Sequence, residues 1–222
     1  MKPKPKGKLA IFDTFKTKNQ ELTGEAKRQR AIITILGSNV NPAERTRTGI
    51  SQKIAKKQGI TWKNIYSGIF RDLDEILLPM GIAEENGRLP LKRGPKALQE
   101  KGIPYYHLTK KGVLVKLSIN GVENMSSEFK KFFAESEPNE KKFETILSKF
   151  MTNSPTFTYS IFQKYVKAFC EDKIKEILPF DLSKLQDIPD ENLIIQKEIV
   201  LAFEKLSSKE KKEAIVFLEK IT

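Results

Sequence analysis

The stretch ISQKIAKKQGITWKNIYSGIF, residues 50–70, contains the spacing from which the fold of this chain is best inferred. Its first part predicts a helix that ends at Gly59, because glycine is the residue best suited to the left-handed position after a helix. The small Ala55 stands four positions before this glycine, and the aliphatic Ile65 stands ten positions after Ala55. These offsets allow two helices to cross closely at a tight turn. The stretch therefore predicts a helix-turn-helix, although the same offsets also occur in helical hairpins that bind no DNA.

The helices around this turn follow from apolar spacing and capping residues. A first helix is expected over 25–36, after the N-cap candidate Thr23, and a second over 50–58. A third is expected over 61–78, with Thr61 as its N-cap and Pro79 as its end. Its apolar residues recur at steps of three and four, which is typical of an amphipathic helix. They are Trp62, Ile65, Ile69, Leu73, Ile76 and Leu77.

The opposite face of the 61–78 helix is polar. At 100° per residue its polar members share one arc. Together with the cap they are the DNA-binding candidates on this helix: Thr61, Lys63, Asn64, Ser67 and Arg71. Arg and Lys side chains can pair with guanine and Asn with adenine. Gly68 on the same arc would let the helix approach DNA closely. An ordinary solvated polar face is the alternative interpretation.

Two extended segments follow, at 82–85 and 105–108, and we expect them to pair as a hairpin. The intervening loop, 86–104, carries five basic residues against the single acidic Glu100, a net charge of +4. Its DNA-binding candidates are Arg88, Lys92, Arg93, Lys96 and Lys101. Such a loop is either an enlarged DNA-contacting wing or a solvated insertion. We favour the wing, because the basic excess of the chain concentrates around it.

The segment YYHLTKKGVLV, residues 105–115, contains Leu108, Thr109 and Gly112. A Leu-Thr-x-x-Gly segment after the wing strand is characteristic of winged-helix transcription regulators of the PadR and MarR type, which residues 23–118 resemble. The resemblance implies that the 61–78 helix lies in the major groove of DNA and that the hairpin tip meets the backbone or the minor groove. The chain departs from these regulators in the length of its 86–104 loop.

Charge divides the chain into unlike halves. The net charge is +12, and residues 1–121 carry 24 basic and 10 acidic side chains, whereas residues 122–222 carry 16 and 18. A basic part joined to a near-neutral one is typical of a phosphate-binding module with an attached assembly module. We therefore predict a basic N-terminal arm and lead-in at 1–22, a winged-helix nucleic-acid-binding domain at 23–121 and a helical dimerisation or partner-binding domain at 122–222. Within the arm, the first eight residues are expected to be disordered.

The C-terminal part is predicted to be all-helical, which makes the whole chain mainly α. Candidate helices lie at 126–134, 139–152, 155–177, 191–205 and 208–221, and Ser207 and Glu210 have the spacing of a capping box. This part holds 11 of the 14 Phe residues, enough apolar bulk for a core of its own. We expect it to form a homodimer.

Other function classes lack a signal. One Cys and one His exclude an internal disulfide and a recognisable zinc site. No phosphate-cradling GxxxxGK[ST], GxGxxG or GxSxG motif occurs, so we predict no enzymatic activity, no cofactor and no metal. No apolar run approaches the roughly 20 residues of a membrane span, and the first residues lack the apolar segment of a secretion signal. The expected compartment is the cytoplasm.

The leading hypothesis is a DNA-binding transcriptional regulator that reads duplex DNA with the 61–78 helix and the 86–104 wing. The alternative is a nucleoprotein component without sequence specificity, in replication, plasmid maintenance or chromosome organisation. Its phosphate contacts would matter more than its base contacts. An enzyme acting on nucleic acid would need a catalytic constellation that the sequence does not display.

Overall fold

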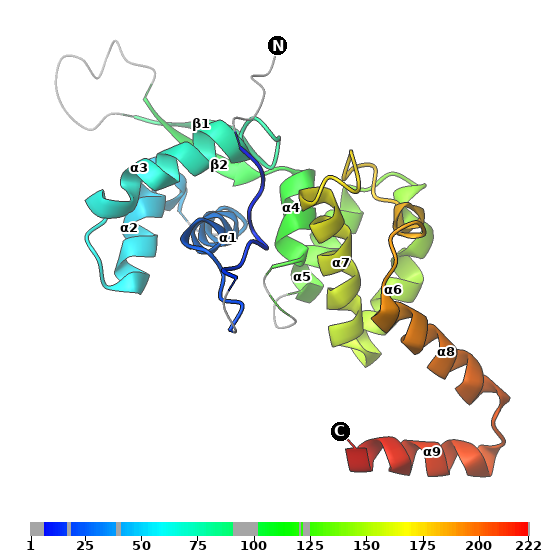
Figure 1. Cartoon of the computed structure of the whole chain (residues 1–222). Helices are drawn as coiled ribbons and strands as arrows, with labels where there is room; N and C mark the ends of the chain where they lie inside the picture. The colour runs from blue at the N-terminus through cyan, green and yellow to red at the C-terminus, as the bar shows by residue number, and fades with distance from the viewer. Residues whose placement is uncertain are drawn as a thin grey trace, which may run out of the picture. The chain divides into compact units, whose positions relative to one another are not determined.

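The computed structural model describes residues 7–16, 19–38, 41–90, 102–119, 121 and 125–221. These residues form a mainly helical fold with one two-stranded antiparallel sheet (Figure 1), which confirms the predicted fold class at that level. The chain divides into two units, Met1–Leu182 and Ser183–Thr222. Within the described residues, no helix combines the length and the apolar character that crossing a bilayer requires.

Three helices open the first unit: α1 (Gly24–Leu36), α2 (Arg47–Gln58) and α3 (Lys63–Arg71). The 3-10 turn η1 (Pro42–Arg45) precedes α2. As predicted, Thr23 caps α1, its Oγ1 accepting a hydrogen bond from the Ala26 N–H at 3.1 Å, and Gly59 ends α2 with φ 68°. α2 begins three residues earlier than predicted because Thr46 caps it, accepting a bond from the Gly49 N–H at 3.0 Å.

The third helix differs from the prediction at both ends. Thr61 is not its cap: α3 begins after Trp62, whose side chain makes no capping bond, and the Thr61 carbonyl accepts the Asn64 N–H at 3.0 Å. The first turn therefore uses a backbone carbonyl in place of the hydroxyl. After Arg71 the helix widens into a π-helical turn, η2 (Asp72–Leu77), which continues the same rod.

The hairpin consists of β1 (Ala83–Leu89) and β2 (Ile103–Leu108), paired antiparallel with Ala83 opposite Leu108. The predicted strands 82–85 and 105–108 are thus too short, since pairing continues outward past a bulge between Glu85 and Gly87. Thr46, at the start of α2, forms a further bridge with Tyr105 of β2. This bridge fixes the hairpin beside the helix pair.

The elements after the hairpin are α4 (Lys110–Leu117), α5 (Met125–Ala134), η4 (Glu140–Phe143), α6 (Glu144–Asn153), α7 (Pro155–Cys170), η5 (Leu182–Leu185), α8 (Glu191–Lys205) and α9 (Ser208–Ile221). The predicted 139–152 helix starts as the 3-10 turn η4. The predicted 155–177 helix is wrong beyond Cys170, because Asp172 takes a left-handed backbone with φ 58°. The predicted bounds 191–205 and 208–221 are confirmed, as is the capping box, in which the Ser207 N–H donates to Glu210 at 2.8 Å.

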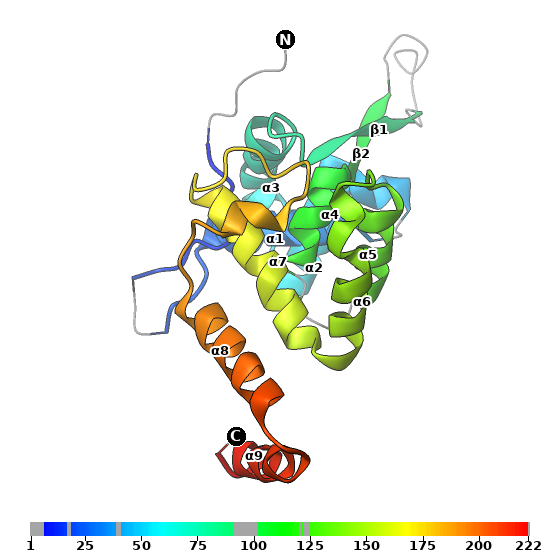
Figure 2. The same cartoon turned by 90° about the vertical axis from the view of Figure 1, so that its right-hand side faces the viewer.

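α4 lies between the N-terminal helices and the later ones, in contact with α1, α5 and α7 (Figures 1 and 2). On its far side an aromatic core joins α5, α7 and the segment after α7, where Phe180 stacks on Phe162 with ring centroids 5.6 Å apart. α5 to α7 therefore belong to the same unit as the hairpin and the helix-turn-helix, and α8 and α9 make up most of the second unit. The contact-based division thus has a single boundary, after Leu182, and none near residue 121.

Part of the predicted 1–22 arm and lead-in contributes to the core. Leu9, Ala10 and Ile11 are buried. The Ala10 N–H donates to the buried Gln29 side chain of α1 at 2.8 Å. Lys8, expected to be disordered, pairs with Asp13 at 3.0 Å, and the hydrogen bond from this pair raises the Lys8 pKa. Residues 1–6 of the predicted arm lie outside the described residues.

Candidate nucleic-acid interface

α3 presents one exposed polar row. Lys63, Asn64, Ser67 and Arg71 are all exposed, and Thr61 is exposed just before the helix begins. The structure thus brings five of the predicted site residues onto one surface. Opposite them, the expected apolar residues Ile69, Leu73, Ile76 and Leu77 are buried.

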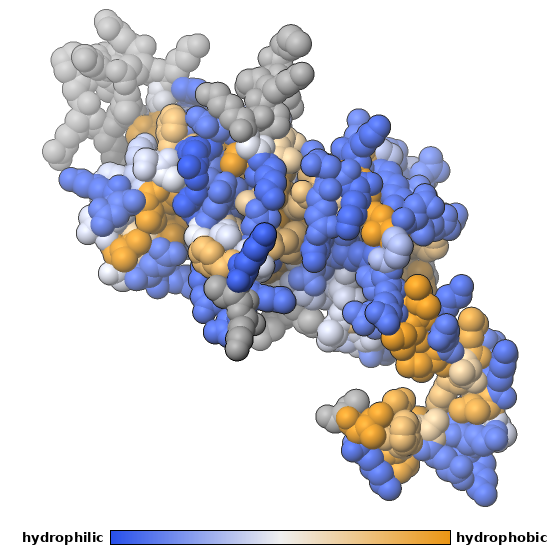
Figure 3. Space-filling model, viewed as in Figure 1, coloured by the Kyte–Doolittle hydropathy of each residue, from blue (hydrophilic) through white to orange (hydrophobic). Residues whose placement is uncertain are grey.

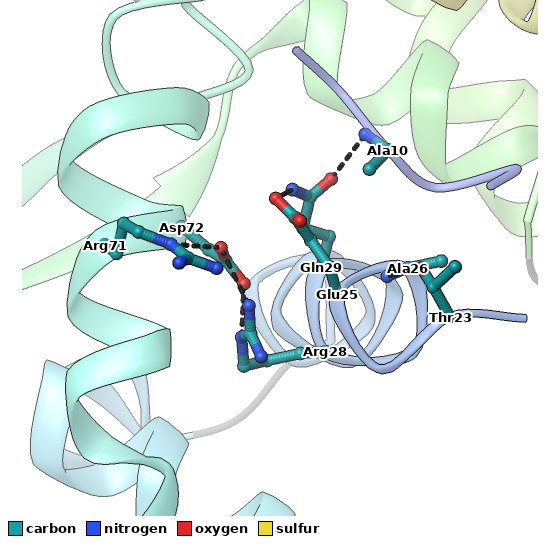
Figure 4. A network of polar contacts seen from close by, with 8 residues as sticks. All are labelled: Ala10, Thr23, Glu25, Ala26, Arg28, Gln29, Arg71 and Asp72. Carbon is teal, nitrogen blue, oxygen red and sulfur yellow. Dashed lines mark hydrogen bonds and ion pairs between the residues drawn. The ribbon is translucent and has the colours of Figure 1, made fainter. Parts of the chain in front are cut away.

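Two residues depart from this simple division of α3 and η2. Phe70 is exposed although it is apolar, and Asp72 is completely buried although it is charged. The Asp72 carboxylate accepts two hydrogen bonds from Arg28 of α1, from Nε at 2.5 Å and from Nη2 at 3.1 Å (Figure 4). Arg71 Nε lies 3.8 Å from the same carboxylate, and the Arg71 side chain is 54% exposed. The Arg28–Asp72 pair therefore links α1 to the end of α3 and leaves Arg71 at the surface.

Gly68 leaves the space that the Arg28 side chain of this pair occupies. A Cβ atom at Gly68 would lie 3.0 Å from Arg28 Nε and 3.1 Å from its Cζ, which is closer than ordinary van der Waals contact. The space that was expected to face DNA is thus occupied by the Arg28 guanidinium. The absent side chain of Gly68 lets Arg28 cross beneath α3 to reach Asp72.

A second arginine pair joins α2 to η2. Arg47, the first residue of α2, donates to Asp74 from Nε at 2.9 Å and from Nη2 at 2.5 Å. Its guanidinium lies over the rings of Phe70 and Tyr106, 5.2 Å from each centroid. Burial lowers the Arg47 pKa, but the hydrogen bonds to Asp74 and the attraction of Tyr106, Asp74 and Tyr66 together outweigh it, and the net shift is upward. Arg47 is therefore a structural cation at the start of α2, with its side chain 26% exposed.

The hairpin contributes one described member of the predicted wing set. Arg88 lies in β1, not in a loop, and pairs with Glu85 through bonds of 2.6 and 3.1 Å. It also donates to the Gly102 carbonyl at 3.4 Å. A phosphate contact by Arg88 would thus compete with Glu85. Four predicted site residues lie outside the described residues: Lys92, Arg93, Lys96 and Lys101.

Sequence reasoning did not select Arg45, which stands where α2 and the hairpin meet. Its guanidinium lies over the Tyr105 ring at 5.4 Å from the centroid, next to the Thr46 bridge. Among the described residues, its buried Nε has no hydrogen-bond partner. A buried donor without a partner is uncommon in native structures. The only sequence signal for it was a basic residue before a helix.

The Leu-Thr-x-x-Gly segment acts as a joint at the base of the hairpin. Thr109 Oγ1 donates to the Gly81 carbonyl at 2.6 Å and accepts the Gly112 N–H at 3.2 Å, capping α4. A Cβ atom at Gly112 would lie 2.1 Å from the Ile82 carbonyl oxygen. The Thr and the Gly are therefore both needed to pack α4 against the turn that begins β1.

The remaining chemistry-bearing side chains offer little reactivity. Burial raises the pKa of Cys170 to about 12, so its thiol stays protonated near neutral pH and is a poor nucleophile. His107 Nε2 lies 3.2 Å from Glu84 across the hairpin. In the part of the chain that the structure describes, no His, Cys, Asp or Glu side chains gather in a way that would hold a metal ion.

Comparison with known proteins identifies no relative of this chain. The chain matches no protein-family model and no curated protein, and its structure matches no solved structure.

Proposed function

We propose that this chain is a cytoplasmic, duplex-DNA-binding protein whose residues 23–121 form a winged helix-turn-helix. In this proposal α2 and α3 are the helix-turn-helix and β1 with β2 is the wing. The observation that carries it is the exposed row of Lys63, Asn64, Ser67 and Arg71 on a helix whose other face is fastened to α1 and α2. A rigidly held helix with two cations and an amide on its outer face matches what a major-groove reader needs.

Electrostatics support the same surface. Arg28 and Arg47 are neutralised by buried or half-buried carboxylates beneath α3. By contrast, Lys56, Lys57 and Lys63 are exposed around the turn between α2 and α3 and form no ion pair with any described residue. Such unopposed cations are the groups that release counterions when a phosphate backbone approaches.

The proposed role is transcriptional regulation by a homodimer that pairs through its C-terminal helices. A two-fold protein presents two α3 helices to two half-sites of a palindromic duplex. This role requires that base contacts contribute to affinity. A nucleoprotein component would instead bind a preferred site and a random duplex almost equally.

The test uses the full chain and a duplex selected from a random pool. In the Lys63→Ala/Ser67→Ala/Arg71→Ala variant we expect affinity for the selected duplex to fall by at least 10-fold, since each base contact is worth about 1 to 3 kcal/mol. Random duplex should lose less. The matched control is Lys130→Ala/Lys149→Ala, which removes the same two charges from exposed positions on α5 and α6. A folded triple variant with full affinity and unchanged site preference would refute the proposal.

The same measurement separates the two roles. Specific DNA-binding proteins prefer their site over random duplex by about 10³-fold or more. If wild type prefers the selected duplex by less than about 10-fold, its role is not transcriptional regulation, and the nucleoprotein component is the better assignment.

A further inference from the structure

α8 and α9 carry 10 of the 16 exposed large apolar residues of the described chain. Neither helix buries a single residue. Val200 of α8 is 66% exposed, and Phe217 and Ile221 of α9 are 60% and 63% exposed. Figure 3 shows the corresponding apolar surface on both helices. Scattered exposed apolar residues are normal on proteins, but a contiguous set on two consecutive helices marks an interaction site.

The two helices do not cover each other. Leu206, between them, has an extended backbone with φ −73° and ψ 147°, and the Ser207–Glu210 capping box starts α9 directly afterwards. The helices consequently diverge from this junction (Figures 1 and 2). The apolar residues of α8 are also distributed around the helix, from Ile194 to Val200 and Phe203. Exposed apolar residues that gather on one element mark an interaction site, so we expect α8 to have a covering partner.

Charge favours a second copy of this unit as that partner. Residues 183–222 carry seven basic and eight acidic side chains, a net charge of −1. Since the whole chain has a net charge of +12, residues 1–182 have a net charge of +13. Two near-neutral units can approach each other without net repulsion. Two of the basic first units could not do so as readily.

The surface of α9 is also suited to pairing with itself. Val216 and Phe217 line a groove of about 350 Å³, and its rim carries Lys212, Glu213 and Lys220. A two-fold contact brings the same patch of both copies together, so a rim must be self-complementary. A rim with both signs of charge meets this condition, since lysines of one copy can face the glutamate of the other.

The available area is sufficient for a stable dimer. With about 180 Å² for a fully exposed large apolar side chain, the exposed apolar residues of α8 and α9 offer roughly 900 Å² per chain. A standard protein interface buries about 800 Å² on each partner. The helices therefore present an interface of ordinary size on a unit of only 40 residues.

We infer that α8 and α9 pair with α8 and α9 of a second copy, so that four helices enclose these apolar side chains. The inference rests on the proposed homodimer and assigns its contact to residues 183–222. It does not place the contact on α5 to α7, because their aromatic residues Phe132, Phe133 and Phe162 are buried within the first unit. Of the large apolar residues on these three helices, only Ile146 and Phe150 of α6 are exposed.

The test is sedimentation of the full chain between about 1 and 100 µM, roughly the range in which weak dimers dissociate, in the absence of DNA. Wild type should sediment at twice the chain mass of 25.4 kDa. Val200→Glu/Phe217→Glu should weaken the dimer by at least 100-fold and give the monomer mass. Both residues are exposed in the single chain, so its fold is retained, which circular dichroism will verify. The matched control, Lys197→Gln/Lys205→Gln, changes the net charge by the same two units, keeps every apolar residue and should remain dimeric.

Three outcomes would contradict these statements separately. A monomeric wild type would overturn the homodimer itself. A dimeric Val200→Glu/Phe217→Glu variant would leave the homodimer in place and overturn its assignment to α8 and α9. A control variant that dissociates as fully as the test variant would show that charge, not apolar contact, holds the copies together, and would also overturn the assignment. Loss of DNA binding is read in a different assay and affects none of these results.

Discussion

Replacing the buried carboxylate of Asp72 tests how α3 is held in position. Asp72→Asn keeps the shape of the side chain but removes its charge, leaving the Arg28 guanidinium without its counterion. Breaking a buried ion pair by removing one partner costs about 3 to 5 kcal/mol. The Asp72 side chain is 0% exposed but that of Arg28 is 21% exposed, so water can partly compensate the cation. We therefore expect a loss of about 3 kcal/mol, at the lower end of that range.

Urea unfolding of the full chain measures this loss. Trp62, the single tryptophan, lies directly before α3, so its fluorescence reports on this region of the chain. With a slope of about 2 kcal/mol per molar urea, a loss of 3 kcal/mol lowers the midpoint by about 1.5 M. Asp74→Asn is the matched control, because its pair with Arg47 is more exposed, at 17% and 26%. It should lower the midpoint by less.

A double-mutant cycle then isolates the pair from its surroundings. If Arg28 and Asp72 stabilise the chain through each other, Arg28→Met combined with Asp72→Leu will cost less than the sum of the two single substitutions. Additive losses, or an Asp72→Asn midpoint within 0.2 M of wild type, about 0.4 kcal/mol at that slope, would refute the inference that this pair fastens α3 to α1.

Three further substitutions test separate joints of the fold. Gly68→Ala should not give the gain of about 1 kcal/mol expected for Gly→Ala in a helix, because the new Cβ would displace the Arg28 guanidinium; a full gain in urea unfolding would contradict this. Gly112→Ala should lower the melting temperature by several degrees, because its Cβ would lie 2.1 Å from a backbone oxygen, and an unchanged melting temperature would show that α4 can shift freely. Burial alone would raise the pKa of Glu140, but bonds from Lys110 and from two backbone N–H groups lower it below 4.5, so wild type should lose stability as the pH falls through that lowered pKa. Glu140→Gln should be less stable at neutral pH and lack this acid-dependent loss, and an identical pH profile for both proteins would argue against the role of the carboxylate.

The end of a helix was predictable where a local sequence signal, such as a capping residue, determines it. It was not predictable where only the burial of side chains was available as a guide. α9 begins as expected because Ser207 and Glu210 cap it within four residues. α7 ends at Cys170, although the apolar spacing continues to Ile174 and Ile177. Both isoleucines are buried in the non-helical segment that follows. The spacing of apolar residues indicates which residues are buried. A buried non-helical segment can show the same spacing as a buried helix.

The exposed row of α3 was predictable from the angle between successive residues, whereas the pairs beneath it were not. A helical projection places Asp72 at the border of the polar arc, between Gly68 and the apolar Ile65, and does not predict that it is fully buried. Its complete burial depends on Arg28, 44 positions earlier in the chain, and on the space left by Gly68. Contacts of this separation are not encoded in any local pattern. The same holds for Arg47, whose partner Asp74 lies 27 positions later in the chain.

These pairs change how the charge of the first 121 residues relates to DNA binding. Each ion pair removes one positive and one negative charge, so the net charge of +14 stays the same while the carboxylates that might oppose it are used up. Six of the 10 acidic residues in this part have a Lys or Arg partner: Asp13, Glu21, Glu44, Asp72, Asp74 and Glu85. The surface left to DNA is therefore more strongly positive in proportion than the composition suggests. Lysines also outnumber arginines in this part of the chain, 17 to 7. The unpaired lysines should then dominate the salt dependence of binding.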